Sequence, residues 1–384
     1  MIMQIKTKNS QGFTLIEMLV AMSISLILLL GVSQIFSSNK RSQRVTEGLA
    51  RVQENARFAM KKISIDMRRA GYVGCAGDNL LNHLDQTDPD YDEDLFDYTK
   101  GTAGWEYTKG LGTSATEPGQ SYTLSTVEPA GTEGAAAKWQ NDKAEGLPTS
   151  LVDKVVPGSD IVVMKWMGDR LNNIDLANAV NPKNASIQTS LNHGIAAGTV
   201  LVISDCSGGD VFQTVANPAS KALTRGKAAG GISPGNANPA KTDWSHAYPN
   251  GANLSAFTSR AYYIGKGTSG EPSLFSITYD QASTAAGVIT EEIAEGIENM
   301  QVLYGVDTNA DKFAEKYVTA EQVTDHSNVV NLKVGLIARS PSDAKTLGLA
   351  RTMSLLGSTI IIPTDKKLRF AFTTTVKLRN KGAK

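Results

Sequence analysis

An apolar run near the amino terminus constrains this chain more than any other feature. Residues Phe13 to Phe36 read FTLIEMLVAMSISLILLLGVSQIF, 24 residues that carry one formal charge. A helix rises 1.5 Å per residue, so this run would be about 36 Å long, enough to cross the apolar core of a bilayer. The sequence therefore predicts a membrane-spanning helix.

A short polar leader, MIMQIKTKNSQG, precedes the run and carries Lys6 and Lys8. A secretory signal peptide would have a shorter apolar stretch, followed by a cleavage site of small residues. In this chain the helical pattern continues past the run. Cleavage after the helix is therefore not expected.

The continuation has the pattern of an amphipathic helix. Small and apolar residues recur every three or four positions among charged and amide residues: Val45, Leu49, Val52, Ala56, Ala59, Ile63, Met67 and Ala70. Such spacing places one apolar stripe along a helix. Residues 13–70 contain no proline, and Gly71 is a suitable stop. We predict one rod of 58 residues, about 87 Å long.

Glu17 is the single charge within the apolar run. A carboxylate within a membrane helix costs about 3 kcal/mol. By position alone, Glu17 either reaches headgroups and water near the start of the helix or pairs with a cation of a neighbouring chain. The residues that precede it bear on this choice.

The stretch Gly12-Phe-Thr-Leu-Ile-Glu17, between a basic leader and an apolar helix, resembles the class III signal of type IV pilins and pseudopilins. The resemblance implies that a prepilin peptidase cuts after Gly12 on the cytoplasmic side and methylates Phe13, the new amino terminus. It also implies that Glu17 is an assembly contact. There it would neutralise the Phe13 ammonium of a neighbouring subunit where water is scarce.

Two features depart from that pattern. Lys40, Arg41 and Arg44 follow the helix, whereas Lys6 and Lys8 precede it, so the count of basic residues does not support a cytoplasmic leader. The orientation rests on the resemblance. Many major pilins also have a proline in the membrane helix, and this helix has none. Its absence removes the basis for expecting the helix to melt locally during assembly.

After Gly71 the apolar pattern changes from helical to alternating. Segments rich in β-branched and aromatic residues, bounded by Gly, Pro, Asn and Asp, are typical of strands. We expect strands at 160–166, 199–204, 211–215, 261–264, 273–279, 300–304, 329–337 and 367–378, and a short helix at 290–299. The expected fold class is α+β and type IV pilin-like, with the rear half of the long helix packed on an antiparallel β-sheet.

Long polar stretches separate these segments. His83–Gly146 and Ala216–Asn253 are expected to be solvated loop insertions, and the acidic run Asp85–Asp97 within the first is expected to face solvent. The expected organisation is a cytoplasmic leader at 1–12, a transmembrane helix at 13–36, an amphipathic extension at 37–70 and a periplasmic β-rich domain at 71–384.

The body resembles one branch of the pilin family, the large minor pilins known as PilW. Four segments carry the likeness: MRRAGYVGC at 67–75, SDCS at 204–207, GIENMQVLYGVD at 296–307 and FTTTVKLRN at 372–380. The resemblance implies a minor pilin of a type IV pilus. Such a protein helps to start assembly at the inner membrane of a Gram-negative bacterium and is then carried on the surface pilus, at or near the fibre tip.

The same resemblance implies partners and roles. The partners would be other minor pilins, the major pilin, the prepilin peptidase and the inner-membrane assembly platform, with a tip adhesin as a further candidate. The filament would serve twitching motility, adhesion or DNA uptake. A pseudopilin of a type II secretion system shares this amino terminus and is the alternative. The length of the body and the closing FTTTVKLRN segment favour the minor pilin.

The two cysteines, Cys75 and Cys206, are too few for a zinc ribbon. In a body outside the cytoplasm they could form a disulfide. The bridge would close a loop of 131 positions (206 minus 75) and stabilise the fold by about 5 kcal/mol. Two unrelated buried thiols are the alternative.

Neither composition nor motifs indicate an enzyme. Lys plus Arg and Asp plus Glu each total 38, which disfavours a polyanion partner, and the four histidines are scattered singly. Gly265–Gly270 formally matches G-x-G-x-x-G, but Pro272 follows at once and we interpret the segment as a turn. An exported hydrolase on a pilin-like anchor would lack a candidate nucleophile and base. We expect no catalytic residues and no cofactor.

One segment has the alternating oxygen ligands of a calcium loop, at Asp307, Asn309 and Asp311. However, Lys312 stands where an EF-hand needs glycine, and Val318 stands where it needs glutamate. A solvated turn is the expectation, with these three residues as a weak candidate for a metal site.

Overall fold

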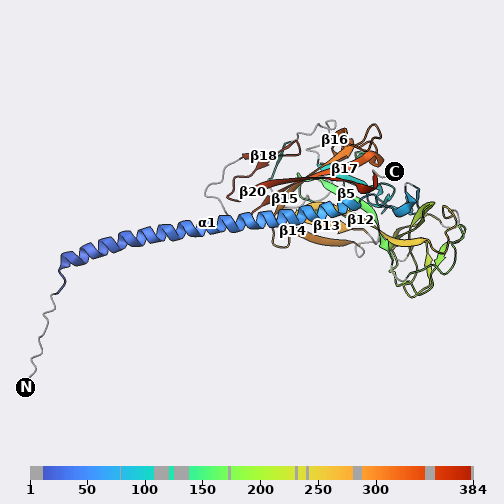
Figure 1. Cartoon of the computed structure of the whole chain (residues 1–384), viewed down its shortest axis with the longest axis horizontal. Helices are drawn as coiled ribbons and strands as arrows, with labels where there is room; N and C mark the ends of the chain where they lie inside the picture. The colour runs from blue at the N-terminus through green and yellow to red at the C-terminus, as the bar shows by residue number, and fades with distance from the viewer. Residues whose placement is uncertain are drawn as a thin grey trace, which may run out of the picture.

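One long helix carries a β-rich body at its far end (Figure 1). The computed structural model describes residues 12–77, 79–107, 121–124, 138–171, 174–229, 232–238, 242–279, 288–341 and 351–381. The leader up to residue 11 lies outside the described residues. Helix α1 (Leu15–Arg69) is 55 residues long and confirms the predicted rod. Among the described residues, it is the one helix long and apolar enough to cross a membrane.

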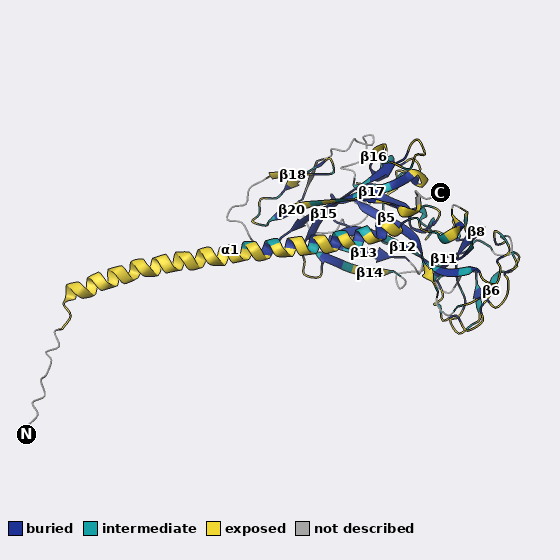
Figure 2. Ribbon diagram, viewed as in Figure 1, coloured by how far each residue is buried: buried dark blue, intermediate teal, exposed yellow. Residues whose placement is uncertain are grey.

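The two halves of α1 differ in exposure, as Figure 2 shows. Every large apolar side chain from Leu15 to Phe36 is more than half exposed. In the second half one stripe is buried, and it includes the predicted positions Val52, Ala56, Ala59, Ile63 and Met67, whereas the predicted Val45 and Leu49 are half-buried. Small residues in this stripe let the helix approach the sheets closely. The amphipathic pattern thus predicted the face that packs on the body.

The larger sheet of the body has nine strands. Its main path runs β1-β8-β7-β12-β5-β2-β4, and β13 and β14 extend it from β12. All of its neighbours are antiparallel except β1 and β8. The strands are β1 (Leu80–Asn82), β2 (Thr102–Tyr107), β4 (Trp139–Gln140), β5 (Ile161–Arg170), β7 (Val200–Asp205), β8 (Gly208–Gln213), β12 (Asn253–Lys266), β13 (Pro272–Thr278) and β14 (Ile289–Glu295).

A second, four-stranded antiparallel sheet has the order β16-β15-β17-β20. Its strands are β15 (Ile297–Val306), β16 (Lys316–Val318), β17 (Val329–Arg339) and β20 (Arg369–Lys377). Leu332, Val334 and Leu336 of β17 share one hydrophobic core with the buried stripe of α1. The body therefore offers α1 two sheets rather than the single sheet that we expected, and the α+β class is confirmed.

The opposite face of β17 is covered by a small three-stranded sheet. This sheet consists of β3 (Ser121–Thr123), β18 (Arg351–Leu355) and β19 (Ser358–Ile362), and its Leu355 and Ile360 share a core with Ile337. Short helices complete the described body: η1 (Gly74–Ala76), α2 (Glu93–Phe96), η3 (Ala320–Gln322), η4 (His326–Asn328) and η5 (Arg379–Lys381).

A separate lobe with its own core lies at the end of the body farthest from the amino terminus (Figure 1). It contains β6 (Ser186–Gln188), β9 (Ala222–Thr224), β10 (Lys227–Ala229) and β11 (Ile232–Gly235). Trp244 and Tyr248 are buried in it, and the Arg225 guanidinium lies 4.2 Å from the Trp244 ring. The prediction that 216–253 is a solvated insertion is wrong. A few widely spaced aromatic side chains complete a core with β7 and β8, and such spacing leaves no periodic signal.

The predicted helix at 290–299 is also wrong. The segment forms all of β14 except its first residue, a turn at Gly296 and the start of β15. Gly296 has φ +78°, and its N–H donates to the carbonyl of Pro272 at 2.7 Å. The pairing of β14 with β13 shifts register at Leu274, which brings Ile293 and Ala294 to the core together. This irregularity imitates helical spacing in the sequence.

The expectation of a solvated loop at 85–97, within the longer stretch 83–146, fails for its second half. Asp94, Leu95 and Phe96 of α2 are buried, as is His83 just before the run. Further on, Trp105 and Trp139 are buried. Charged residues flank a few apolar ones, and their tertiary contacts decide the burial. Residues 108–120 and 125–137 of this stretch lie outside the described part.

Candidate functional site

Gly12 and Phe13 precede the helix and are exposed, Phe13 by 89%. The helix begins at Leu15, with Thr14 as its N-cap in extended conformation. The bond between Gly12 and Phe13 is therefore outside the hydrogen-bonded part of α1. A peptidase can reach it without unwinding the helix.

Glu17 is bound by its own chain through a capping box. Its Oε2 accepts from the backbone N–H of Thr14 at 2.9 Å and from the Thr14 hydroxyl at 2.8 Å. In return, Thr14 Oγ1 accepts from the Glu17 N–H at 3.3 Å. Sequence reasoning missed this arrangement, although Thr14-x-x-Glu17 is the S/T-x-x-E signal of a capping box. The carboxylate is thus held in a fixed position four residues after Phe13.

The second half of α1 is fixed to the body by Asp66, a buried charge that the apolar pattern did not reveal. Its Oδ2 accepts from Arg260 Nη1 at 2.8 Å and from the Tyr262 hydroxyl at 2.6 Å, both on β12. Burial and the Asp66 carboxylate raise the pKa of Tyr262 well above its usual range, so this hydroxyl remains a donor. The carboxylate thus has two donors, one of them a guanidinium, as a buried charge requires.

Three hydrogen bonds to backbone carbonyls fix the second half of α1 and the residue that follows it. Asn55 Nδ2 donates to the carbonyl of Glu295 at 2.9 Å, next to the Gly296 turn. The Gly71 N–H donates to the carbonyl of Lys165 at 2.8 Å. Asn380 Nδ2, in the closing segment of the chain, donates to the carbonyl of Arg69 at 3.4 Å. Hydrogen bonds from the nine-stranded sheet and from the carboxyl-terminal segment therefore hold α1, and the four-stranded sheet adds apolar contacts.

Cys75 lies in η1, directly after α1, and Cys206 lies in the turn between β7 and β8. Both are free thiols in this structure, and both are exposed. They are hydrogen-bonded to each other, and this bond raises the pKa of the Cys75 thiol. The structure thus brings the two residues together, and they are neither buried nor unrelated. The disulfide itself stays a prediction.

The weak candidate for a metal site is a turn in which backbone N–H groups donate to the Asp307 carboxylate. Asp307 Oδ1 accepts from the backbone N–H groups of Asn309 at 3.1 Å and Ala310 at 2.7 Å, and its Oδ2 accepts from the backbone N–H of Lys312 at 2.8 Å. Although burial opposes it, these N–H groups lower the pKa of Asp307. Oxygens of Asp307, Asp311 and Glu315 lie within 4.8 Å of one another. The carboxylates of Asp311 and Glu315 are exposed, so we assign no metal here.

The structure brings together a serine, a histidine and an aspartate that sequence reasoning did not connect. Ser245 Oγ lies 2.9 Å from His246 Nδ1, and His246 Nε2 lies 3.0 Å from Asp205 Oδ1. However, Ser245 also donates to Asp210 Oδ2 at 2.6 Å. The Asp210 carboxylate is the stronger acceptor and takes the single hydroxyl proton. The arrangement anchors the lobe and does not activate a nucleophile.

A buried carboxyl group joins β5 to β15. Asp160 accepts from the N–H of Tyr107 at 3.2 Å and from the N–H of Val302 at 2.9 Å, and it is hydrogen-bonded to Glu106. Burial raises the pKa of Asp160 to about 7. The Asp160 carboxyl group therefore keeps its proton at pH values where an exposed aspartate is ionised.

In comparisons with known proteins, family models match the amino-terminal part and the carboxyl-terminal part of the chain. The family model for Type IV Pilus-assembly protein W (PilW) matches residues 261–380, and the model for the prokaryotic N-terminal methylation motif matches residues 7–33. No curated protein matches the chain. A solved type IV-like pilin from Thermus thermophilus is 16% identical over 49% of this chain and 87% of that chain, with a TM-score of 0.22.

The two family models match separate parts of the chain. The methylation motif contains Gly12, Phe13 and Glu17. The PilW match runs from the middle of β12 to η5 and includes the whole four-stranded sheet that packs on α1. The contacts above join Tyr262, Glu295 and Asn380 of the PilW match to residues 55–69 of α1, which follow the methylation motif on the same helix.

Proposed function

We propose that this PilW-like type IV pilin, which carries a class III signal, is a minor pilin that helps to start pilus assembly and stays at or near the fibre tip. The observation that carries the proposal is one uninterrupted helix, α1, which joins the signal at Gly12–Glu17 to the PilW-like sheet. Such a chain can stand in a membrane before assembly and in the helical core of a filament afterwards.

Maturation is the first step. The prepilin peptidase cuts the exposed bond after Gly12 and methylates the new terminus at Phe13. Before assembly the apolar half of α1 anchors the protein in the inner membrane, with the body in the periplasm. The exposed apolar side chains of this half then pass from lipid to the helices of sibling pilins.

Glu17 is proposed to guide assembly. Cleavage creates an ammonium at Phe13, and the carboxylate of a neighbouring subunit can neutralise it. Both bonds from Thr14 end on Oε2 of Glu17, which leaves Oε1 for the incoming cation. Because Thr14 already orders the side chain, less conformational entropy is lost when the pair forms.

The test begins with a deletion of the gene, which is then complemented by the wild type or by variants. Each strain is scored for surface pili, twitching and DNA uptake, and separately for protein secretion. Gly12→Ala should leave a precursor of higher mass and restore no pili. Glu17→Ala should be processed normally but recover less of the sibling pilins on co-purification. Loss of secretion with normal pili would instead identify a pseudopilin. Normal processing of Gly12→Ala would contradict the proposed signal.

A further inference from the structure

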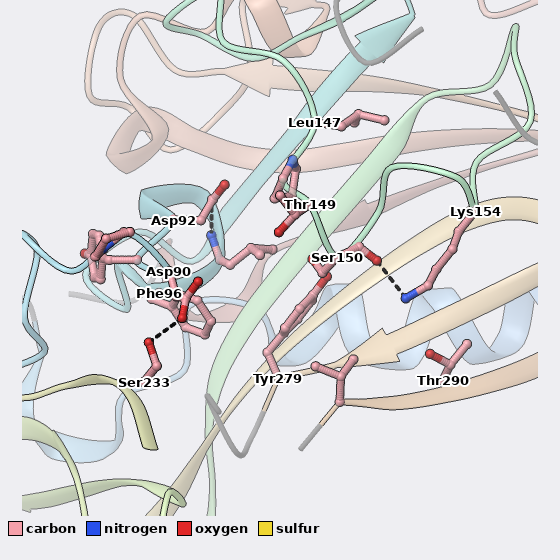
Figure 3. A pocket seen from close by; sticks show the side chains of 15 residues that line it. Asp90, Asp92, Phe96, Leu147, Thr149, Ser150, Lys154, Ser233, Tyr279 and Thr290 are labelled. Carbon is pink, nitrogen blue, oxygen red and sulfur yellow. Dashed lines mark hydrogen bonds between the residues drawn. The ribbon is translucent and has the colours of Figure 1, made fainter. Parts of the chain in front are cut away.

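A cavity of about 780 Å³ opens where α2, residues 147–154 and the ends of β13 and β14 meet (Figure 3). Its floor is apolar and aromatic and consists of Leu95, Phe96 and Tyr279, all buried. Phe96 and Tyr279 meet edge to face with their ring centres 6.0 Å apart. A cavity of this volume with an apolar floor and a few polar groups is typical of sites for small ligands.

One wall of the cavity is acidic. Figure 3 shows Asp90 and Asp92 on the side opposite Thr149 and Lys154. Ser233 Oγ lies 2.8 Å from Asp88 Oδ1 and 2.8 Å from Asp90 Oδ2. A hydroxyl has one proton, so it can satisfy one of these two carboxylates at a time. Negative charge therefore gathers at this wall without full compensation.

Asp92 adds to this charge from a less exposed position. Its Oδ1 accepts from the Leu95 N–H at 3.1 Å, as the N-cap of α2. Burial, together with the neighbouring Asp94, raises the pKa of Asp92 to about 6. A carboxyl group in this position gains from any cation that enters the cavity.

The cations nearby are engaged elsewhere. Lys100 and Lys143 both pair with Glu93 of α2, which is not part of the cavity lining. Lys154, which lines the cavity, donates its Nζ to the carbonyl of Ser150 at 2.7 Å. Lys165, whose charge also acts on Asp92, is buried and donates its Nζ to the carbonyl of Asp94 at 2.7 Å. Within the described ranges, neither Asp90 nor Asp92 is thus seen in an ion pair with a lysine or arginine, and a cation from outside the chain can pair with them.

We propose that this cavity binds a cationic group on a short apolar stem, a guanidinium or ammonium on a chain of three or four carbons. The stem lies over the apolar floor, and the cation meets Asp90 and Asp92, with the half-buried Tyr91 ring beside it. A free small cation and an arginine or lysine side chain of a partner protein share this chemistry. The inference concerns the body alone and is independent of the role in the pilus.

The test uses the full chain in detergent micelles and a ligand-observed NMR titration. The probe is n-butylguanidinium, and its matched control is N-butylurea, which has nearly the same shape but no charge. We expect the urea to bind at least about tenfold more weakly, because a hydrogen bond to a charged group contributes 1.5–3 kcal/mol. Equal affinity of the two probes, or no binding of butylguanidinium, would overturn the proposal.

Variants of the wall locate the site. Asp90→Asn and Asp92→Asn should each weaken butylguanidinium binding about tenfold, and Asn at 92 preserves the N-cap of α2. Asp169→Asn, an exposed position on β5 outside the cavity, is the matched control and should bind normally. Thr149→Trp should block the cavity from an exposed position. Unchanged binding in all three cavity variants would overturn the assignment.

A second titration distinguishes the two sources. The tripeptide acetyl-Gly-Arg-Gly-amide should bind more tightly than butylguanidinium if the natural ligand is a protein segment, and more weakly if it is a free small cation. Both results support a cationic ligand, and they distinguish a protein segment from a free small cation as its source. The matched uncharged control is the same peptide with citrulline in place of arginine. If it binds as tightly as the arginine peptide, the proposed cationic site is refuted.

Discussion

The two halves of α1 are continuous in backbone but differ in what surrounds their apolar side chains. From Leu15 to Phe36 these side chains are exposed on all sides, whereas from Val52 to Met67 one stripe is buried against two sheets. The first half therefore requires a membrane or neighbouring helices to cover it. The second half is covered by the chain itself, so its contacts can be tested in the isolated protein.

The largest effect is expected where the second half carries its buried charge. Asp66→Ala removes the partner of Arg260 and Tyr262, and breaking such a pair should lower the free energy of unfolding by about 3–5 kcal/mol. All four tryptophans lie in the body, so tryptophan fluorescence in a urea titration reports on it. Glu54→Ala, exposed on the same helix, is the control and should change the free energy of unfolding by less than about 0.5 kcal/mol.

The cysteine pair extends the comparison to the residues directly after α1. If Cys75 and Cys206 are bridged in the oxidised protein, a reductant should lower the free energy of unfolding by about 2–5 kcal/mol. The double variant Cys75→Ser, Cys206→Ser should show the same lowered value and no response to the reductant. Mass spectrometry after alkylation gives the direct answer, since two modified thiols without reductant would refute the bridge.

The same substitution in both halves compares them directly. Ala59→Leu places a larger side chain in the fully buried stripe and should destabilise the body by about 1–3 kcal/mol. Ala21→Leu, in the exposed half, should leave the unfolding of the body unchanged. Equal effects from both variants would show that the two halves do not differ as described.

A further expected effect is a pH dependence of the stability of the body. The pKa of Asp160 is raised to about 7, so the folded chain holds a proton that the unfolded chain releases above about pH 4. This contribution to stability is complete below pH 4 and is lost as pH rises to 7. Asp160→Asn should remove that decline.

His326 opposes this trend. Burial lowers its pKa to about 3, so its contribution is present above pH 6.5 and is lost as pH falls. The free energy of unfolding should therefore be measured for the wild type and for Asp160→Asn at several pH values between 4 and 7. The informative quantity is the difference between the two proteins at each pH. A difference that does not vary with pH would contradict the raised pKa.

Periodic features of the sequence predicted most of the framework. Each of the eight expected strands overlaps an observed one, namely β5, β7, β8, β12, β13, β15, β17 and β20. The rod and its buried stripe followed from three- and four-residue spacing, which depends only on neighbours along the chain. The Thr14 partner of Glu17 is equally local and could have been recognised from the sequence.

Features that depend on distant partners could not be predicted in this way. Asp66 interrupts no periodic pattern, and its partners Arg260 and Tyr262 are 194 and 196 positions away. The lobe around Trp244 forms from widely separated aromatic residues. β14 resembled a helix because a register shift and the Gly296 turn alter its spacing. Each of these features depends on a pairing between segments, which no single window of sequence contains.

The continuous helix also determines how a mechanical load would enter the body. α1 lies along the sheets rather than end-on to them (Figure 1), so tension on its membrane end acts parallel to the contact surface. The bonds from Asn55 and Asp66 to the body would then be strained together, in shear, instead of opening one after another. In the proposed role, in which α1 joins the subunit to its filament, this arrangement would resist tension along the filament.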